Sequence, residues 1–175
     1  MSKPNLLEVY SVILLENAGY FLLLKRAASK SFAPGRWTGV GGRVEAEEFN
    51  DLRASALREL GEETGLSEAD VAGFTLRRVL ALARPDGYLV VLVYFTGKLS
   101  ARLTPDCSEG TLSWVAPEQL AGLDVIETSR PVLQLLVSDH ARDPQGLELV
   151  QMGVGVYDSK GRFSQVIWGQ QEKNY

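Results

Sequence analysis

One acidic segment constrains this chain more than any other: residues Arg58–Gly65, with the sequence Arg-Glu-Leu-Gly-Glu-Glu-Thr-Gly. The apolar residues before and within it recur at the spacing of an amphipathic helix: Leu52, Ala56, Leu57 and Leu60. Asp51 stands where an N-cap side chain is needed, and Gly65 suits the left-handed position that follows a helix. The pattern therefore predicts a short helix that begins after Asp51 and ends at Gly65.

The predicted helix places three carboxylates on one face. Positions i, i+3 and i+4 of an α-helix are neighbours, so Glu59, Glu62 and Glu63 project together within about one 5.4 Å turn. Each pair of like charges destabilises a helix by roughly a few tenths of a kcal/mol, unless a hard divalent cation lies among the oxygens. A solvated acidic face is the ordinary alternative for a Glu-rich helix, and the surrounding sequence must decide between the two.

Composition limits the kind of metal site and the partners to be expected. The chain has 175 residues, with one cysteine (Cys107) and one histidine (His140). These residues allow no internal disulfide and supply too few ligands for a zinc site, so oxygen must hold any metal. The net charge of -4 and the pI of about 5.1 argue against binding to long nucleic acid. A small anionic ligand, bridged to the protein by a cation, fits this charge.

The length suits a single domain over residues 1–175. No apolar run approaches the roughly 20 residues that a membrane span needs, so we expect a cytoplasmic protein with no membrane partner. The sequence leaves open whether the protein is a monomer or a homodimer.

Runs of β-forming residues and turn residues outline the rest of the fold. Strands are predicted at Val9–Leu15, Tyr20–Lys25, Thr75–Ala83, Tyr88–Thr96 and Thr111–Val115. A glycine-rich extended stretch follows from Thr38 to Val44, a second helix spans Arg130–His140, and a C-terminal hairpin covers about 147–168. This order of elements predicts an α/β fold in which a mixed β-sheet lies between α-helices.

The acidic helix and the glycines before it resemble the Nudix box. The residues that fill its positions are Gly42, Glu48, Arg58, Glu59, Leu60, Glu62, Glu63, Gly65 and Leu66, so the box covers about 42–66. One departure is that nine residues, and not seven, separate Glu48 from Arg58. The additional residues fit before the Asp51 cap, so the helix keeps its geometry, whereas the role of Glu48 depends on how the longer loop folds.

The resemblance implies a Nudix fold and a role for each matching residue. The implied ligands of Mg²⁺ or Mn²⁺ are the backbone carbonyl of Gly41 and the side chains of Glu48, Glu59, Glu62 and Glu63. Arg58 corresponds to the arginine that orients the catalytic carboxylates, and Glu59 or a downstream acid is the implied general base. In such a site the cations neutralise the phosphate oxygens and make a bound water acidic enough to attack.

Two flanking segments resemble a branch of this family, the MutT-like 8-oxo-dGTP diphosphatases. These segments are 34–42 and 105–115, and the second places Glu109 where a loop contributes a metal ligand or base. The base-reading Asn and Asp of some relatives are replaced here by Thr38 and Ser129. Both hydroxyl groups can still hydrogen-bond a base edge, and Trp37 can stack a base, although packing in the core is the alternative for this ring.

Two basic residues flank the glycine-rich stretch. Arg26 ends the second predicted strand, and Arg43 directly follows Gly42. Both can reach phosphate oxygens from either side of the loop, and a solvated surface arginine is the alternative for each.

These features predict a hydrolase of phosphoric anhydride bonds that converts a nucleoside triphosphate to the monophosphate and pyrophosphate. The leading substrate is 8-oxo-dGTP or a related modified purine nucleotide. The alternatives are hydrolysis of nucleoside diphosphate sugars, dinucleoside polyphosphates or nucleoside diphosphates, and a non-catalytic module that senses nucleotides.

Overall fold

Burial along the first strand decides how the sheet is covered. Strand β1 (Leu6–Asn17) is buried without interruption from Ser11 to Glu16. A strand that is buried on both faces requires a layer on each side of its sheet. The computed structural model that shows this arrangement describes residues 6–104 and 106–169.

Eight strands form a mixed sheet in the order β3-β2-β1-β5-β4-β7-β8, with β6 paired to β2. The remaining strands are β2 (Tyr20–Arg26), β3 (Trp37–Thr38), β4 (Val71–Ala83), β5 (Tyr88–Leu99), β6 (Gly110–Val115), β7 (Gln151–Tyr157) and β8 (Phe163–Trp168). Strand β1 runs parallel to β5, and β4 runs parallel to β7, whereas the other pairs are antiparallel. The predicted strands are confirmed, most of them with longer bounds.

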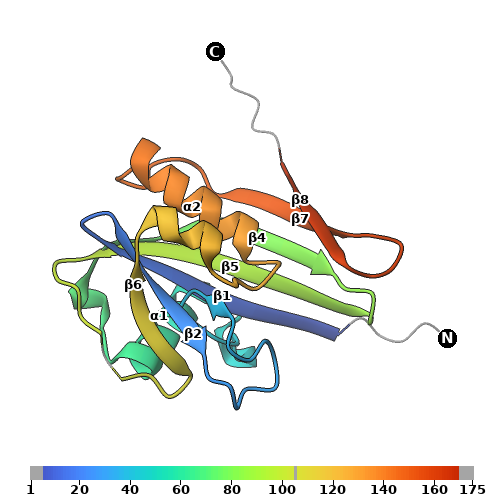
Figure 1. Ribbon diagram of the computed structural model, residues 1–175, viewed down its shortest axis with the longest axis horizontal. Coiled ribbons are helices and arrows are strands. Elements are labelled where there is room, and N and C mark those ends of the chain that lie inside the picture. The colour runs from blue at the N-terminus through green and yellow to red at the C-terminus, as the bar shows by residue number, and fades with distance from the viewer. Residues whose placement is uncertain (1–5, 105, 170–175) are drawn as a thin grey trace.

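Two helices cover opposite faces of this sheet: α1 (Leu52–Thr64) and α2 (Arg130–Arg142) (Figure 1). On one face Ile13 and Leu15 of β1 belong to the same apolar cluster as Leu60 of α1. The alternate residues of β1 point the other way, into the cluster that holds α2. The predicted mixed sheet between helices is therefore confirmed.

The caps of α1 form as the sequence predicts. The Asp51 side chain accepts a hydrogen bond from the backbone N–H of Ala54 at 3.0 Å. Gly65 ends the helix at φ 70°, and its N–H donates to the carbonyl of Gly61. In the described part of the chain, three short 3₁₀ helices accompany the two α-helices: η1 (Ala46–Glu48), η2 (Glu68–Asp70) and η3 (Pro117–Gly122).

The C-terminal hairpin begins later than predicted, at Gln151 and not near residue 147. The reason is a side chain that competes with strand pairing. Asp143, which caps the C-terminus of α2, accepts hydrogen bonds from the N–H groups of Leu147 and Glu148 at 3.0 and 2.9 Å. The backbone at these two residues is therefore bound to the end of α2 and does not pair as a strand. Leu147 is consequently 78% exposed.

Within residues 6–104 and 106–169, no helix combines the length and the apolar character that crossing a membrane requires. The predicted extent of the domain, 1–175, and the segment that starts at Pro105 include residues outside these ranges. The single-domain interpretation therefore stays a prediction.

Candidate functional site

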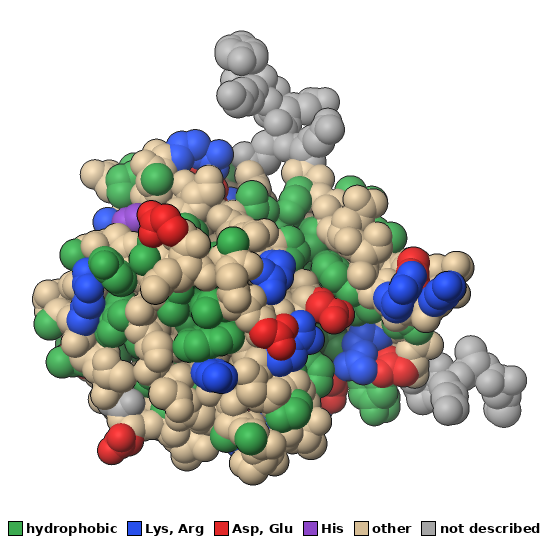
Figure 2. Space-filling view, viewed as in Figure 1, with side chains coloured by type: hydrophobic (Ala, Val, Ile, Leu, Met, Phe, Trp, Pro, Cys, Tyr) green, Lys and Arg blue, Asp and Glu red, His purple; other side chains and the backbone are tan. Residues whose placement is uncertain are grey.

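A cleft of about 1340 Å³ brings the predicted site residues together with parts of the chain that are distant in sequence. Its walls are the acidic face of α1, the glycine-rich stretch, the loop before α2 and the C-terminal hairpin. Figure 2 shows acidic and basic side chains next to one another on the side of the molecule that carries the hairpin β7–β8. The volume exceeds the roughly 300–1,000 Å³ typical of small-molecule sites, so the cleft has room for a nucleotide.

Arg58 holds the acidic residues of the box in place. Its guanidinium donates two hydrogen bonds to Glu48, from Nε at 2.6 Å and from Nη2 at 2.9 Å. Nη1 donates to Glu59 at 2.9 Å and to Glu62 at 3.1 Å. The bidentate pair with Glu48 forms despite the longer loop. Residues 49–50 lie in a turn before the Asp51 cap, and the N–H of Asp51 donates to the carbonyl of Glu48 at 2.9 Å.

Glu48 is bound to Arg58 and lies outside the residues that line the cleft. Its hydrogen bonds to Arg58 lower its pKa to about 2, so it stays ionised at neutral pH. Glu59, Glu62 and Glu63 do line the cleft. A metal-binding role for Glu48 stays a prediction, whereas its contact with Arg58 is what the structure shows.

Two carboxylates of α1, those of Glu63 and Glu59, are largely shielded from solvent. The pKa of Glu63 is raised to about 7, chiefly by burial, and repulsion from Glu59 and Glu109 contributes to this rise. The backbone N–H of Gly41 donates to Glu63 at 2.8 Å and opposes this shift. Burial also raises the pKa of Glu59. A cation between these groups would stabilise both charges.

The glycine-rich stretch lies against β1 and the acidic helix at distances that only glycine permits. The N–H of Ser11 donates to the carbonyl of Gly42 at 2.9 Å. Gly41 has a φ of 135°, and a Cβ there would lie 2.3 Å from the carbonyl oxygen of Ser11. A Cβ on Gly42 would lie 2.4 Å from a carboxylate oxygen of Glu59. Both glycines therefore bring backbone next to the carboxylates.

The donors in this part of the cleft suit a hard divalent cation such as Mg²⁺ or Mn²⁺. Carboxylate oxygens from Glu59, Glu62 and Glu63 and the carbonyl of Gly41 are the oxygen ligands such ions prefer. In the described part of the chain, no three Asp, Glu, His or Cys side chains are grouped so as to hold a metal ion. Glu59 and Glu62 instead form ion pairs with Nη1 of Arg58 at 2.9 and 3.1 Å.

Basic residues line the cleft on the side of the glycine-rich stretch. Arg26 donates a hydrogen bond from Nε to the carbonyl of Phe32 at 2.9 Å. Nη2 of Arg43 lies 3.6 Å from Oε1 of Glu8. Arg36 also lines the cleft, although sequence reasoning did not single it out. It is anchored by a 2.9 Å hydrogen bond from Nη2 to the carbonyl of Val125. Its position inside the segment 34–42, which resembles the MutT-like branch, was the available signal.

Glu109 reaches the cleft from the loop before β6 and forms an ion pair with Lys30 at 2.6 Å. Its charge raises the pKa of Glu63, so the two carboxylates lie near each other. The structure thus brings the predicted downstream acid to the helix carboxylates. Its role as base or ligand stays a prediction.

The three predicted base-binding residues are placed differently. Thr38 and Ser129 line the cleft but are only 9% and 4% exposed, and the hydroxyl groups of Ser129 and Tyr94 lie 3.4 Å apart. Trp37 lies outside the lining residues, because it neighbours Thr38 on β3 and so points to the opposite face. Nζ of Lys25 lies 6.0 Å from the centre of the Trp37 ring.

Comparison with known proteins identifies relatives over most of the chain. The family profile described as NUDIX domain matches residues 6–136. The nucleoside triphosphatase NudI of Salmonella agona (strain SL483) is 32% identical over 130 residues, which cover 70% of this chain and 91% of that protein.

Solved structures show the same fold. The mMutator MutT protein from Bacillus halodurans superposes with a TM-score of 0.65 at 18% identity, covering 92% of this chain and 97% of that one. The MutT protein from Methanosarcina mazei Go1 gives a TM-score of 0.58 at 24% identity, covering 82% and 99%.

Proposed function

The chain belongs to the NUDIX domain family, and we propose that it hydrolyses a nucleoside triphosphate to the nucleoside monophosphate and pyrophosphate with the help of Mg²⁺ or Mn²⁺. The observation that carries this proposal is that Glu59, Glu62 and Glu63 of α1 line the same cleft, with Arg58 bound to Glu59 and Glu62. The named activity of the 32% identical relative, a nucleoside triphosphatase, supports the choice of substrate class.

Each group in the cleft has a task in this reaction. The carboxylates of Glu59, Glu62 and Glu63, with the carbonyl of Gly41, would hold the cation, which when bound neutralises phosphate oxygens and acidifies water. Arg26 and Arg43 also line the cleft and would hold the polyphosphate. These contacts fix the phosphate chain so that its reacting bond lies next to the acidic face.

Proton removal from the attacking water requires a carboxylate near the cleft. Several carboxylates line the cleft, and we assign the base to Glu59 or Glu109. Arg58 contacts Glu59 directly and therefore orients it without touching substrate.

The leading substrate in this proposal is 8-oxo-dGTP or a related modified purine nucleotide. The hydroxyl groups of Thr38 and Ser129 stand in the cleft, but their burial gives them little access to a base edge. The test must therefore include unmodified nucleotides of each base beside 8-oxo-dGTP.

Incubation of the purified protein with a nucleotide panel and Mg²⁺ or Mn²⁺ tests the proposal. The panel contains 8-oxo-dGTP, the unmodified nucleoside triphosphates, nucleoside diphosphates, a nucleoside diphosphate sugar and a dinucleoside polyphosphate. Separation of the products distinguishes monophosphate with pyrophosphate from diphosphate with phosphate. We expect turnover of at least one triphosphate, with pyrophosphate as a product.

Two variants provide the contrast. Glu63→Gln removes one of the buried carboxylates and is expected to lower the rate on the order of 100-fold or more. Glu47→Gln removes an exposed acid from η1 and is expected to leave the rate unchanged. A wild type without turnover of any nucleotide would refute the proposal, and a fully active Glu63→Gln would refute the metal-site assignment.

A further inference from the structure

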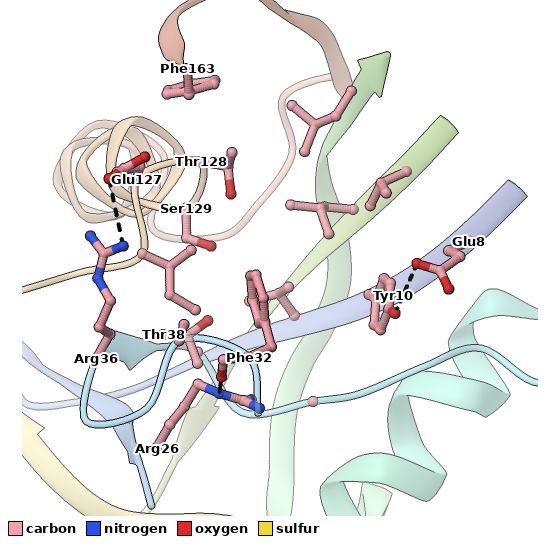
Figure 3. Close-up of a pocket in the computed structure, with 18 of the residues that line it drawn as sticks. Glu8, Tyr10, Arg26, Phe32, Arg36, Thr38, Glu127, Thr128, Ser129 and Phe163 are labelled. Carbon is pink, nitrogen blue, oxygen red and sulfur yellow. Dashed lines mark hydrogen bonds and ion pairs between the residues drawn. The ribbon is translucent and has the colours of Figure 1, made fainter. Parts of the chain in front are cut away.

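The C-terminal hairpin forms one wall of the cleft, although it lies outside the residues that match the family profile, 6–136. Its contribution consists of residues at the end of β7, in the turn and at the start of β8. The members of this group are Tyr157, Asp158, Gly161, Arg162, Phe163 and Ser164. Figure 3 places Phe163 across the cleft from Thr38 and Arg26, with Thr128 and Ser129 at the side.

The turn of the hairpin is closed by hydrogen bonds to Asp158 and lies against the β4–β5 turn. Asp158 accepts hydrogen bonds from the N–H groups of Lys160 and Arg162 at 2.8 and 3.0 Å, and from Nε of Arg162 at 2.9 Å. A Cβ on Gly161 would lie 3.3 Å from Pro85 in the β4–β5 turn, so the two turns are in close contact. These hydrogen bonds and the contact with the β4–β5 turn hold the hairpin turn in place at the cleft.

The side chain of Phe163 packs against strand β7 and the ring of Tyr157. A Cβ on Gly155 of β7 would lie 3.2 Å from Cε2 of Phe163 and 2.2 Å from a methyl group of Leu82. The absence of a side chain at Gly155 lets the aromatic ring lie over the strand. Tyr157 packs against it edge to face, with ring centres 6.0 Å apart. These contacts fix the ring, which stays half-buried at the cleft.

The surroundings of Phe163 are those of a site for a planar apolar group. Leu82, Val90 and Leu92 form an aliphatic floor in the same cleft. The phosphate-binding residues and the carboxylates line other walls of this cleft. A nucleotide bound with its phosphates at the carboxylates has its base as the remaining planar group.

We propose that Phe163 is the stacking surface for the nucleobase of the substrate, so that the C-terminal hairpin supplies base affinity. This inference rests on the proposed nucleotide hydrolysis. Every base has a π face, so stacking on one aromatic ring is tolerant of base identity. The protein therefore takes nucleoside triphosphates of more than one base.

Binding measurements separate the base from the phosphates. The probes are α,β-methylene analogues of one purine and one pyrimidine nucleoside triphosphate, which resist cleavage between the α and β phosphates, and inorganic tripolyphosphate, which has no base. Calorimetry in the presence of Mg²⁺ compares wild type with Phe163→Leu and Phe163→Tyr. Ile167→Ala on β8 is the control, because Ile167 is 59% exposed and lies outside the cleft lining.

Phe163→Leu keeps apolar contact with Gly155 but removes the π face. It is therefore expected to lower the binding affinity for both analogues by about 5-fold or more. Phe163→Tyr and Ile167→Ala are expected to bind the analogues within about 2-fold of wild type, since stacking is retained. Tripolyphosphate binding is expected to be equal in all four proteins.

Analogue binding by Phe163→Leu at the wild-type affinity would overturn the stacking role while leaving hydrolysis intact. Loss of tripolyphosphate binding in the same variant would overturn it as well, because the defect would then extend to the phosphate end. If wild type hydrolysed no nucleotide but Phe163→Leu selectively weakened the analogues, the proposed function would fail and the base site would stand.

Discussion

At the scale of single residues, Arg58 determines how the acidic face is arranged. It binds Glu48 through two nitrogens and extends a third to Glu59 and Glu62. Charge-assisted bidentate pairs of this kind are strong and geometrically specific. The side chain of Glu48 is only 18% exposed, so its pairing with Arg58 is largely shielded from solvent. Glu48 thus acts through Arg58 in this structure.

A double-mutant cycle tests this arrangement. Glu48→Gln and Arg58→Ala are each expected to lower kcat/KM, because each disturbs the position of Glu59. The kcat/KM of the double variant is expected to lie within about 3-fold of that of Arg58→Ala alone, because both changes remove the same Glu48–Arg58 interaction. The measurement is kcat/KM for the four proteins. Multiplicative effects would show that Glu48 contributes independently, for example as a metal ligand.

At the scale of elements, α1 combines a packed face with a glycine that no contact requires. Gly61 lies inside the helix, and a Cβ there would meet its nearest neighbour, the carbonyl oxygen of Leu66, at an ordinary 3.6 Å. Gly65 is different, because it ends the helix at φ 70°. The same helix therefore offers one glycine that can be replaced and one that cannot.

We expect Gly61→Ala to stabilise the protein by about 0.5–1 kcal/mol, since alanine has the higher helix propensity. Gly65→Ala is expected to destabilise it by about 1 kcal/mol, because a Cβ is strained in the left-handed conformation. Urea denaturation of the two variants and wild type measures both changes. A destabilised Gly61→Ala would mean that the helix backbone differs from the one described.

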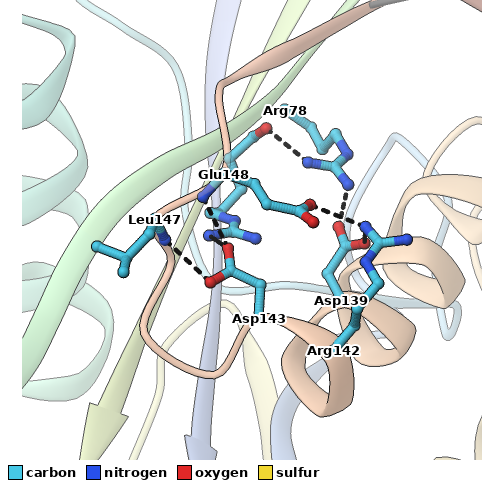
Figure 4. Close-up of polar contacts among 7 residues, drawn as sticks. Arg78, Asp139, Arg142, Asp143, Leu147 and Glu148 are labelled. Carbon is cyan, nitrogen blue, oxygen red and sulfur yellow. Dashed lines mark hydrogen bonds and ion pairs between the residues drawn. The ribbon is translucent and has the colours of Figure 1, made fainter. Parts of the chain in front are cut away.

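The segment between α2 and β7 is organised by a single carboxylate, Asp143. Its oxygens accept from the N–H groups of Leu147 and Glu148 (Figure 4). They also accept from Nη1 of Arg77 at 2.8 Å. These hydrogen bonds, chiefly that from the Glu148 N–H, lower the pKa of Asp143 from 3.8 to about 2. A lowered pKa means that the carboxylate stabilises the fold above pH 3.8 and loses this effect as the pH falls through 2.

Asp143→Asn should therefore lower the Tm at neutral pH, and the difference from wild type should shrink as the pH falls from about 4 to 2. Thermal unfolding at several pH values in this range provides the measurement. Glu118→Gln, at an exposed position of η3, serves as the control. A difference in Tm that stayed constant down to pH 2 would contradict the assigned interaction.

At the scale of the whole molecule, a buried ion pair joins strand β4 of the sheet to helix α2. Arg78 of β4 is 1% exposed and donates to Asp139 of α2, which is 3% exposed. Arg142 also donates to Asp139, at 2.8 Å (Figure 4). Removal of one partner would leave a buried charge without compensation.

Asp139→Ala is expected to destabilise the protein by about 3–5 kcal/mol, whereas the double variant Arg78→Met/Asp139→Leu is expected to be substantially more stable than Asp139→Ala. The reason is that the double variant leaves no uncompensated charge in the interior. Urea unfolding of the three proteins compares their free energies. A double variant as unstable as Asp139→Ala would show that the pair is needed for more than charge balance.

Local features of the chain were predictable because they depend on neighbours in sequence. The spacing of Glu59, Glu62 and Glu63, the Asp51 cap and the Gly65 end all follow from helical geometry. The resemblance to the Nudix box then supplied the Mg²⁺ expectation and the roles. The start of the final hairpin was predicted too early, because the side chain of Asp143 acts on backbone four and five residues ahead.

The sequence by itself therefore determined the acidic helix, the mixed sheet and the kind of chemistry that this helix can support. Tertiary structure decided where Glu48 points, which residues besides the box reach the cleft, and that Phe163 lies across from Thr38. The physical reason is the parallel pairing of β4 with β7, which joins residues more than 70 positions apart and carries no local sequence signal. The acids establish the chemistry through local spacing, and long-range pairing shapes the site around them.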